Sequence, residues 1–304
     1  IRYMRFRMGA VGTKDKDCAG VSRGTNMIFD HCSFSWGQDE TFSINSDGSG
    51  EMHSFTLSNC IFGQGLMLHS AGGLMQGDSI TLYRNLYIDN NTRNNKVKGR
   101  NQYVNNVVYN WNNGAYIMGG DSEGQSYCNV VGNLFINGPA GGGNAFSTGN
   151  TNFHCYLSDN IQDSNKDGKF NPTAVTNNAG ADVVTTPFAY PELETWKANT
   201  LLENLIPTVG ASLPYRDLAD CYMVDELMSL GTEGALISNE ASLPIGAPDT
   251  WNMWKGNAKA DSDGDGMPDE WEKANGTDPA KDDAMNVSSN GYVNIENYIN
   301  SITA

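Results

Sequence analysis

A short pattern that recurs along the first half of the chain limits the possible folds more than any other feature. Two or more apolar residues precede a slot for Asn or Cys, and another apolar pair follows it. The steps between slots are 28, 25, 21, 27 and 27 residues. Short strands repeating at this interval, with Asn at a recurring turn, are typical of a parallel β-helix. The slots hold Cys32, Cys60, Asn85, Asn106, Asn133 and Asn160.

We therefore expect an all-β fold, a right-handed parallel β-helix in which like side chains stack on successive coils and Asn amides form a ladder. Leucine-rich repeats have a similar period, but they need a Leu-rich strand motif that is absent here. Cys32 and Cys60 are 28 residues apart, and Cys128 and Cys155 are 27 apart. These intervals favour stacked interior thiols over disulfides, although the chain has six cysteines, an even number that would permit disulfide bonds.

The repeat pattern stops near residue 178, and this divides the chain into three predicted parts. Residues 1–178 form the β-helix core, from which N-terminal coils are missing, because the chain opens directly on a strand-like run. Residues 179–254 pack on that core and contain helix candidates at 191–206 and 214–229. Residues 255–304 form a small calcium-binding tail.

Composition excludes two classes of partner. The chain has 19 basic and 35 acidic residues and a net charge of −16, so it would repel the phosphates of a nucleic acid. No apolar stretch approaches the roughly 18 residues that a membrane-spanning helix needs. We expect a monomer that binds neither nucleic acid nor membrane.

The segment 261–272 has the spacing of an EF-hand-type calcium loop. Carboxylates occupy its positions 1, 3, 5, 9 and 12, and Gly266 at position 6 permits the turn. The segment and the residues after it resemble the thrombospondin type 3-like or dockerin-like calcium modules of bacterial extracellular enzymes. The predicted ligands are Asp261, Asp263, Asp265, Asp269 and Glu272, with the carbonyl of Met267.

A basic strip interrupts the acidic chain. Four of its 19 basic residues, Arg93, Lys96, Lys98 and Arg100, lie within eight positions between two repeat strands. Asp17 and the pair Asp39–Glu40 lie on neighbouring coils upstream, where stacking at about 4.8 Å brings carboxylates together. A cation site beside an anion site suits a polyanionic substrate bridged by Ca²⁺.

Two segments carry a resemblance to a known family. Residues 28–36, IFDHCSFSW, followed by Asp39–Glu40, look like the "DHCSFSW…DE" segment of pectate lyases of polysaccharide lyase family 1. Residues 93–99, followed by 103–109, resemble that family's "RxPRxRxG…VxNNxxY" signature. The likeness covers about residues 1–235. It implies a parallel β-helix that cleaves polygalacturonate by Ca²⁺-assisted β-elimination.

The resemblance also implies roles for the basic strip. Arg93 matches the family's catalytic base, and Lys98 matches an arginine that binds a substrate carboxylate, with Lys96 and Arg100 beside it. Arginine has a pKa above about 12, so neighbouring cations must lower it, and an alkaline activity optimum would follow.

Asp17 and Asp39 match calcium ligands of the family, and Glu40 substitutes for a further aspartate that reads Ser43 here. A lysine of the family reads Ala71. Two alternatives therefore stay open: a lyase for a modified pectin, such as methylated pectin, and a non-catalytic protein that binds acidic polysaccharide. A galacturonan hydrolase needs a cluster of acids, and the paired acids beside Arg93 are not that cluster. The resemblance implies secretion, to the outside, periplasm or surface of a bacterium.

Overall fold

The computed structural model describes residues 1–119, 124–246 and 257–303. The chain forms two compact units, Ile1–Trp251 and Asn252–Ala304. The predicted boundary between residues 254 and 255 lies outside the described residues, so it stays a prediction. Among the described residues, none of the helices has the length and apolar character that a membrane crossing would require.

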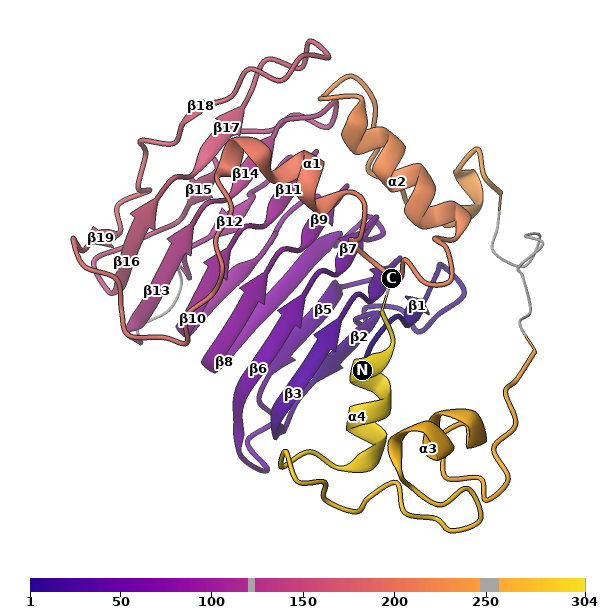
Figure 1. Cartoon of the computed structure of the whole chain (residues 1–304). Helices are drawn as coiled ribbons and strands as arrows, with labels where there is room; N and C mark the ends of the chain where they lie inside the picture. Colours follow the sequence, from indigo (N-terminus) through magenta and orange to yellow (C-terminus); the bar gives the residue numbers. More distant parts are fainter. Residues whose placement is uncertain (120–123, 247–256, 304) are drawn as a thin grey trace. The chain divides into compact units, whose positions relative to one another are not determined.

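The first unit is a solenoid of parallel strands, which confirms the predicted right-handed parallel β-helix (Figure 1). One sheet is built from short strands that recur once per coil, each of three residues except the two-residue β18, and among its described pairings only the last, β17 with β18, is antiparallel. In spatial order it contains β1 (Arg5–Arg7), β4 (Ser33–Ser35), β7 (Ile61–Gly63), β9 (Leu86–Ile88), β11 (Val107–Tyr109), β14 (Leu134–Ile136), β17 (Ile161–Asp163) and β18 (Thr173–Ala174).

The second sheet has eleven strands and carries two rows of pairing, because its long strands β8 and β10 each contribute to both rows. Its main path is β19 (Asp182–Val183), β16 (Phe153–Ser158), β13 (Ser126–Val131), β10 (Lys96–Val104), β8 (Ala71–Tyr83), β5 (Glu40–Asn45) and β2 (Ala19–Val21). Beside this path lie β3 (Gly24–Asp30), β6 (Met52–Ser58), β12 (Tyr116–Ile117) and β15 (Phe146–Ser147).

Each slot residue is the second residue of a two-residue turn between the two sheets. The side-chain amides of the Asn slots form the predicted ladder. Asn85 Nδ2 donates to Asn106 Oδ1 at 3.0 Å, Asn106 Nδ2 to Asn133 at 3.3 Å, and Asn133 Nδ2 to Asn160 at 2.8 Å. The side-chain oxygen of each Asn slot also accepts a backbone N–H group of the preceding coil, as Asn85 Oδ1 accepts from Cys60 N at 2.9 Å. The ladder thus satisfies buried backbone donors that no strand pairs.

The residue before each slot has a left-handed backbone, which the chain needs to turn within two residues. The φ values range from 51° to 66°. Asn and Asp tolerate this conformation best among residues with a side chain. The six positions are His31, Asn59, Arg84, Asn105, Gly132 and Asp159.

Side chains stack inside the solenoid as the repeat predicts. Phe34, Phe62 and Tyr87 form a column on successive coils, with ring centroids 5.1 Å and 5.0 Å apart. Cys128 and Cys155 are register partners, and both are buried as free thiols. The prediction of stacked thiols rather than disulfides is confirmed.

Two helices bury the outer face of the short-stranded sheet. They are α1 (Leu201–Leu205), preceded by the 3-10 turn Ala198–Thr200, and α2 (Leu218–Met228) (Figure 1). Met223 of α2 packs with Ile88 and Tyr109, so both faces of these strands are buried. A further 3-10 turn, Glu240–Ser242, follows.

The helix predicted at 214–229 is present as α2, but the one predicted at 191–206 is wrong over its first half. Gln102 Nε2 donates to the carbonyl of Pro191 at 3.2 Å, and Tyr83 OH donates to that of Glu194 at 2.6 Å. Asn105 also accepts the N–H of Trp196 at 2.7 Å. Side chains of the sheet thus take the backbone groups that a helix would have paired internally.

A pair of carboxyl groups lies between α2 and the solenoid. Asp89 is fully buried and Glu226 is 3% exposed. Burial raises the pKa of both, and the charge of Glu226 raises that of Asp89 further, whereas a hydrogen bond from Asn110 lowers it. Tyr109, Tyr222 and Glu233 also surround the pair, so its titratable neighbours in the described part of the chain add no positive charge that would lower these pKa values.

Replacing Glu226 should flatten the dependence of stability on pH. The folded chain holds a proton here that the unfolded chain loses above about pH 4.3, so native stability falls as pH rises from there. We expect the melting temperature of Glu226→Gln to decline less than that of the native chain between about pH 5 and pH 8. Circular dichroism melts at several pH values measure this, with exposed Glu203→Gln as control. Parallel curves for native chain and Glu226→Gln would show that the pair holds no proton.

Removing one rung of the ladder should destabilise the solenoid. Asn106→Ala leaves the backbone N–H of Asn85 without its acceptor at 3.0 Å. An unsatisfied buried donor costs about 1–3 kcal/mol, and the lost amide adds to this. We expect a clear fall in melting temperature, measured by calorimetry, and almost no change for Asn113→Ala, whose exposed side chain lies outside the ladder. Equal melting temperatures for the two variants would contradict the role of the ladder.

Candidate active site

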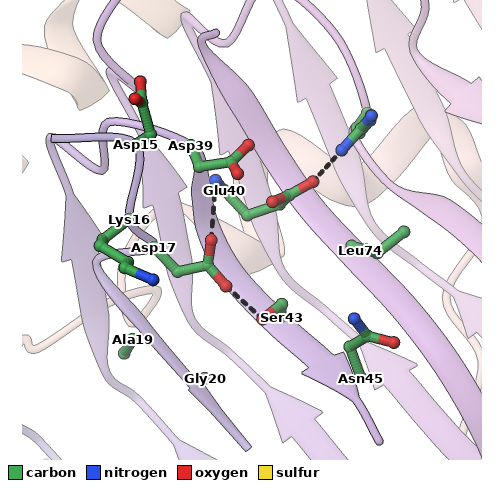
Figure 2. Close-up of a pocket in the computed structure, with 11 residues that line it drawn as sticks. Asp15, Lys16, Asp17, Ala19, Gly20, Asp39, Glu40, Ser43, Asn45 and Leu74 are labelled. Carbon is green, nitrogen blue, oxygen red and sulfur yellow. Dashed lines mark hydrogen bonds and ion pairs between the residues drawn. The ribbon is translucent and has the colours of Figure 1, made fainter. Parts of the chain in front are cut away.

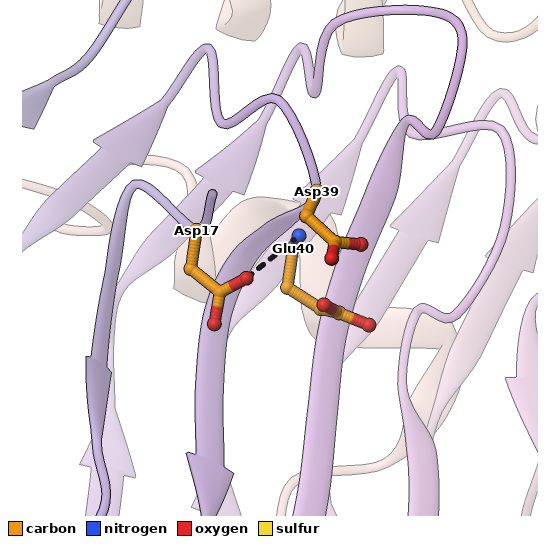
Figure 3. Close-up of side chains that lie close together, drawn as sticks. All are labelled: Asp17, Asp39 and Glu40. Carbon is orange, nitrogen blue, oxygen red and sulfur yellow. Dashed lines mark hydrogen bonds between the residues drawn. The ribbon is translucent and has the colours of Figure 1, made fainter. Parts of the chain in front are cut away.

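Three carboxylates meet where two neighbouring coils enter the eleven-stranded sheet. Asp17 precedes β2, Asp39 precedes β5, and Glu40 is the first residue of β5. Backbone bonds hold these segments in step: Asp39 N donates to the carbonyl of Lys16 at 3.1 Å, and Cys18 N donates to that of Glu40 at 3.0 Å. The ligand oxygens of the three acids all lie within 4.8 Å of one another (Figure 3).

Arg93 reaches the same place from two coils further on. In the sheet, Ala71 is the register partner of Glu40 on one side and of Thr92 on the other. The Arg93 guanidinium nonetheless forms an ion pair with Glu40 through Nη1 and Oε1. It spans the intervening coil because that coil presents only Ala71, Gly72 and Gly73 at this point.

Close packing keeps those glycines free of side chains. A Cβ on Gly72 would lie 2.6 Å from Asn94 Oδ1, and one on Gly73 would lie 2.1 Å from Asn95 Oδ1. Both distances are far shorter than a van der Waals contact. Asn94 and Asn95 thus leave no room for side chains at positions 72 and 73. Ala71, where the resemblance implies a lysine, precedes these two glycines on the coil that Arg93 spans.

A groove of about 460 Å³ exposes this cluster (Figure 2). Asp17, Asp39, Glu40 and Arg93 all line it. Ser43 and Asn45 of β5, Leu74 of β8 and the upstream Asp15, Lys16, Ala19 and Gly20 complete the lining.

The other three residues of the basic strip, Lys96, Lys98 and Arg100, lie on β10 and do not line this groove. Lys96 is the register partner of Leu74, which lines it, and Lys98 is the partner of Gln76. Arg100 follows the irregularity after Gly99 and forms an ion pair with Asp78. Lys96 and Lys98 thus lie in the same row of strand pairing as the groove residue Leu74, whereas Arg100 lies in the second row.

The acids are crowded, and the crowding has an electrostatic cost. Glu40 is 3% exposed, and burial raises its pKa to about 7. Arg93 lowers this pKa, whereas Asp39 and Asp17 raise it. Hard cations such as Ca²⁺ prefer convergent carboxylate oxygens, and a cation here would offset the repulsion. The residues therefore fit a divalent cation.

Two neighbours orient the acids, and sequence reasoning assigned a role to neither. Ser43 donates its Oγ to Asp17, and the backbone N–H of Glu40 donates to the other Asp17 oxygen at 3.2 Å. His69 Nδ1 lies in hydrogen-bond contact with Asp39. Sequence spacing did not indicate His69, because it is 30 residues from Asp39 and the conformation of the loop before β8 brings the two side chains together.

The second unit contains α3 (Asp269–Asn275) and α4 (Asn294–Ser301), and a separate acidic site is built on the loop before α3. The carboxylates of Asp261, Asp263 and Asp265 lie within 4.8 Å of one another, and Asp265 forms a second such group with Glu272 and Asp283. Asp283 was not among the predicted ligands.

Two other predicted ligands of this loop lie differently. Asp269 accepts hydrogen bonds from Ser262 N at 2.7 Å and Ser262 Oγ at 2.8 Å, and it belongs to neither acidic group. Met267 is buried, and its N–H donates to Asp265 at 2.9 Å.

Comparisons with known proteins found one matching family model and several similar relatives. Residues 261–281 match a family model described as Bacterial TSP3 repeat. Proteins called "Probable pectate lyase C" from Neosartorya fischeri and Aspergillus fumigatus are each 45% identical over 307 residues, covering 99% of this chain and 71% of the relative. The one from Aspergillus flavus is 46% identical over 308 residues, with the same shares.

The parallel β-helix and these relatives define a polysaccharide lyase. The chain belongs to the pectate lyase family. These relatives are fungal, so they do not support the predicted bacterial source.

Proposed function

We propose that the chain cleaves polygalacturonate by Ca²⁺-assisted β-elimination at the groove of Asp17, Asp39, Glu40 and Arg93. The observation that carries the proposal is the meeting of three carboxylates and a guanidinium from three different coils in one groove. Such a groove offers a cation site and a basic side chain a few ångströms apart, which this reaction requires.

The reaction breaks two bonds and forms a double bond. A base removes the proton from C5, the electron pair of that bond forms the C4–C5 double bond, and O4 leaves with the electrons of the C4–O4 bond. The difficult step is loss of a proton from carbon next to a carboxylate, because negative charge develops on that carboxylate. Groups that stabilise this charge lower the barrier most.

Arg93 is the proposed base. Its ion pair with Glu40 holds the guanidinium in the groove, so the side chain is positioned before substrate arrives. Ca²⁺ bound by Asp17, Asp39 and Glu40 would supply positive charge to the substrate carboxylate. Ser43 and His69 keep two of these carboxylates in place by their hydrogen bonds.

Lys96 and Lys98 are proposed to bind further carboxylates of the polymer. They stand two residues apart on β10, next to Leu74 and Gln76 of β8, and so extend the groove with positive charge. Arg100 is the outermost member of this strip, and a substrate carboxylate there would compete with Asp78.

Three clustered carboxylates disfavour the alternative of a lyase for methylated pectin. A methyl ester carries no charge for a bridging cation, and such a site would do better with cationic groups in place of Asp17 and Asp39. The chain's family membership favours an enzyme over a non-catalytic polysaccharide-binding protein. Secretion and a monomeric state remain predictions.

Replacing the proposed base should remove turnover and keep binding. Arg93→Ala is expected to lower kcat by a factor of about 10² to 10⁴, the usual contribution of a positioned base. The ultraviolet absorbance of the unsaturated product measures kcat, and sedimentation with insoluble polygalacturonate measures binding. Arg23→Ala, which changes an exposed arginine outside the groove, should be fully active. An active Arg93→Ala enzyme would refute the role of Arg93.

Calcium removal should abolish the reaction reversibly. A chelator is expected to stop product formation, and added Ca²⁺ should restore it. Glu40→Gln keeps the shape of the side chain but removes one ligand charge, so it should need on the order of tenfold more Ca²⁺ for half-maximal activity. Glu51→Gln, an exposed acid outside the groove, is the matched control. Full activity in the chelator would sink the calcium mechanism and leave the family membership intact.

A further inference from the structure

A carboxylate from outside the tail loop points into the acidic site of the second unit. Asp283 lies beyond the segment 261–281 that matches the repeat model. Its carboxylate nevertheless lies within 4.8 Å of ligand oxygens of Asp265 and Glu272, and its backbone N–H donates to Asp265 Oδ2 at 3.2 Å. Asp283 is only 9% exposed, and within residues 1–119, 124–246 and 257–303 it forms no ion pair, an unusual combination for an acid.

Glu272 gives an independent sign that a cation belongs here. Its side chain is fully buried, and neither of its carboxylate oxygens has a hydrogen-bond partner among the residues that the structure describes. Asp263 Oδ2 is likewise buried and unpartnered. Burying a carboxylate without a partner is unfavourable, so buried charges are normally paired or bind metals. One Glu272 oxygen lies within 4.8 Å of ligand oxygens of Asp265 and Asp283.

The loop itself is one carboxylate short of its motif. Asp269, at position 9, accepts two hydrogen bonds from Ser262 and also faces Lys273 Nζ at 3.7 Å. It thus serves to close the loop at the start of α3. A calcium ion takes six to eight oxygen ligands, so the place of Asp269 is open to another oxygen.

We infer that Asp283 is a ligand of the calcium ion in the tail, together with Asp261, Asp263, Asp265 and Glu272. The observation that carries this inference is the convergence of Asp283 and the unpartnered Glu272 on Asp265. It does not depend on the proposed reaction, because this site belongs to the other unit.

The ligand ties the loop to the last helix. Asn294, the first residue of α4, donates from Nδ2 to the carbonyl of Asp283 at 2.9 Å and to its Oδ1 at 3.1 Å. Ile295 N also donates to the carbonyl of Ala284 at 3.0 Å. A cation bound by Asp283 therefore fixes both halves of this unit, and residues 283–297 should become ordered together with residues 261–275.

Hydrogen exchange on the whole chain, followed by mass spectrometry of its peptides during a Ca²⁺ titration, tests this. In the native chain we expect Ca²⁺ to protect residues 261–275 and 283–297 with one common midpoint. Asp283→Asn keeps the acceptor for Asn294 but lowers the ligand charge. It should raise the midpoint on the order of tenfold and reduce protection of 283–297.

Two matched variants make the result decisive. Asp282→Asn removes the same charge at the exposed neighbouring position, and Asp269→Asn removes the motif's own acid; both should keep the native midpoint within about twofold. The inference is overturned if Asp283→Asn behaves like Asp282→Asn, or if Asp269→Asn alone shifts the midpoint. Peptides from residues 1–246 report the active-site region separately, so failure of the proposed lyase chemistry would leave this result unaffected.

Discussion

The stacking of parallel coils at a fixed spacing is the constraint on which the rest of the structure depends. Strand pairing sets the distance between coils, and the ladder from Asn85 to Asn160 satisfies the backbone donors at the turns where strands cannot. With the coils in register, residues at equivalent positions become neighbours. Asp17 and Glu40 then come within reach of one cation although they are 23 residues apart.

The site also needs one coil with almost no side chains. Ala71, Gly72 and Gly73 leave a gap across which Arg93 reaches Glu40, 53 residues earlier in the chain. Burial raises the pKa of Glu40 to about 7, and the neighbouring charges of Asp39 and Asp17 contribute to this rise. Positive charge from a cation or from Arg93 stabilises the ionised trio, and this links the stability of the site to the chemistry proposed for it.

Much of this arrangement could be read in advance from residues that repeat locally. The slots predicted the solenoid, and the acidic segments together with Arg93 predicted four of the residues that line the groove. The helix expected at 191–206 failed over its first half because its apolar spacing carries no record of Tyr83, Gln102 and Asn105, which bind its backbone. Asp269 fitted a motif, yet its carboxylate pairs with Ser262.

The amino-acid sequence alone determined the period of the coils, the ladder and the residue types available for catalysis, because these follow from backbone geometry and apolar patterning within about 30 residues. Only the tertiary structure decided which of those residues meet. Insertions of different length make the steps vary from 21 to 28 residues, so the register of distant side chains depends on the packing of every intervening coil. The contact of His69 with Asp39 arises at that level, whereas the contact of Asp283 with Asp265 depends on the separate fold of the second unit.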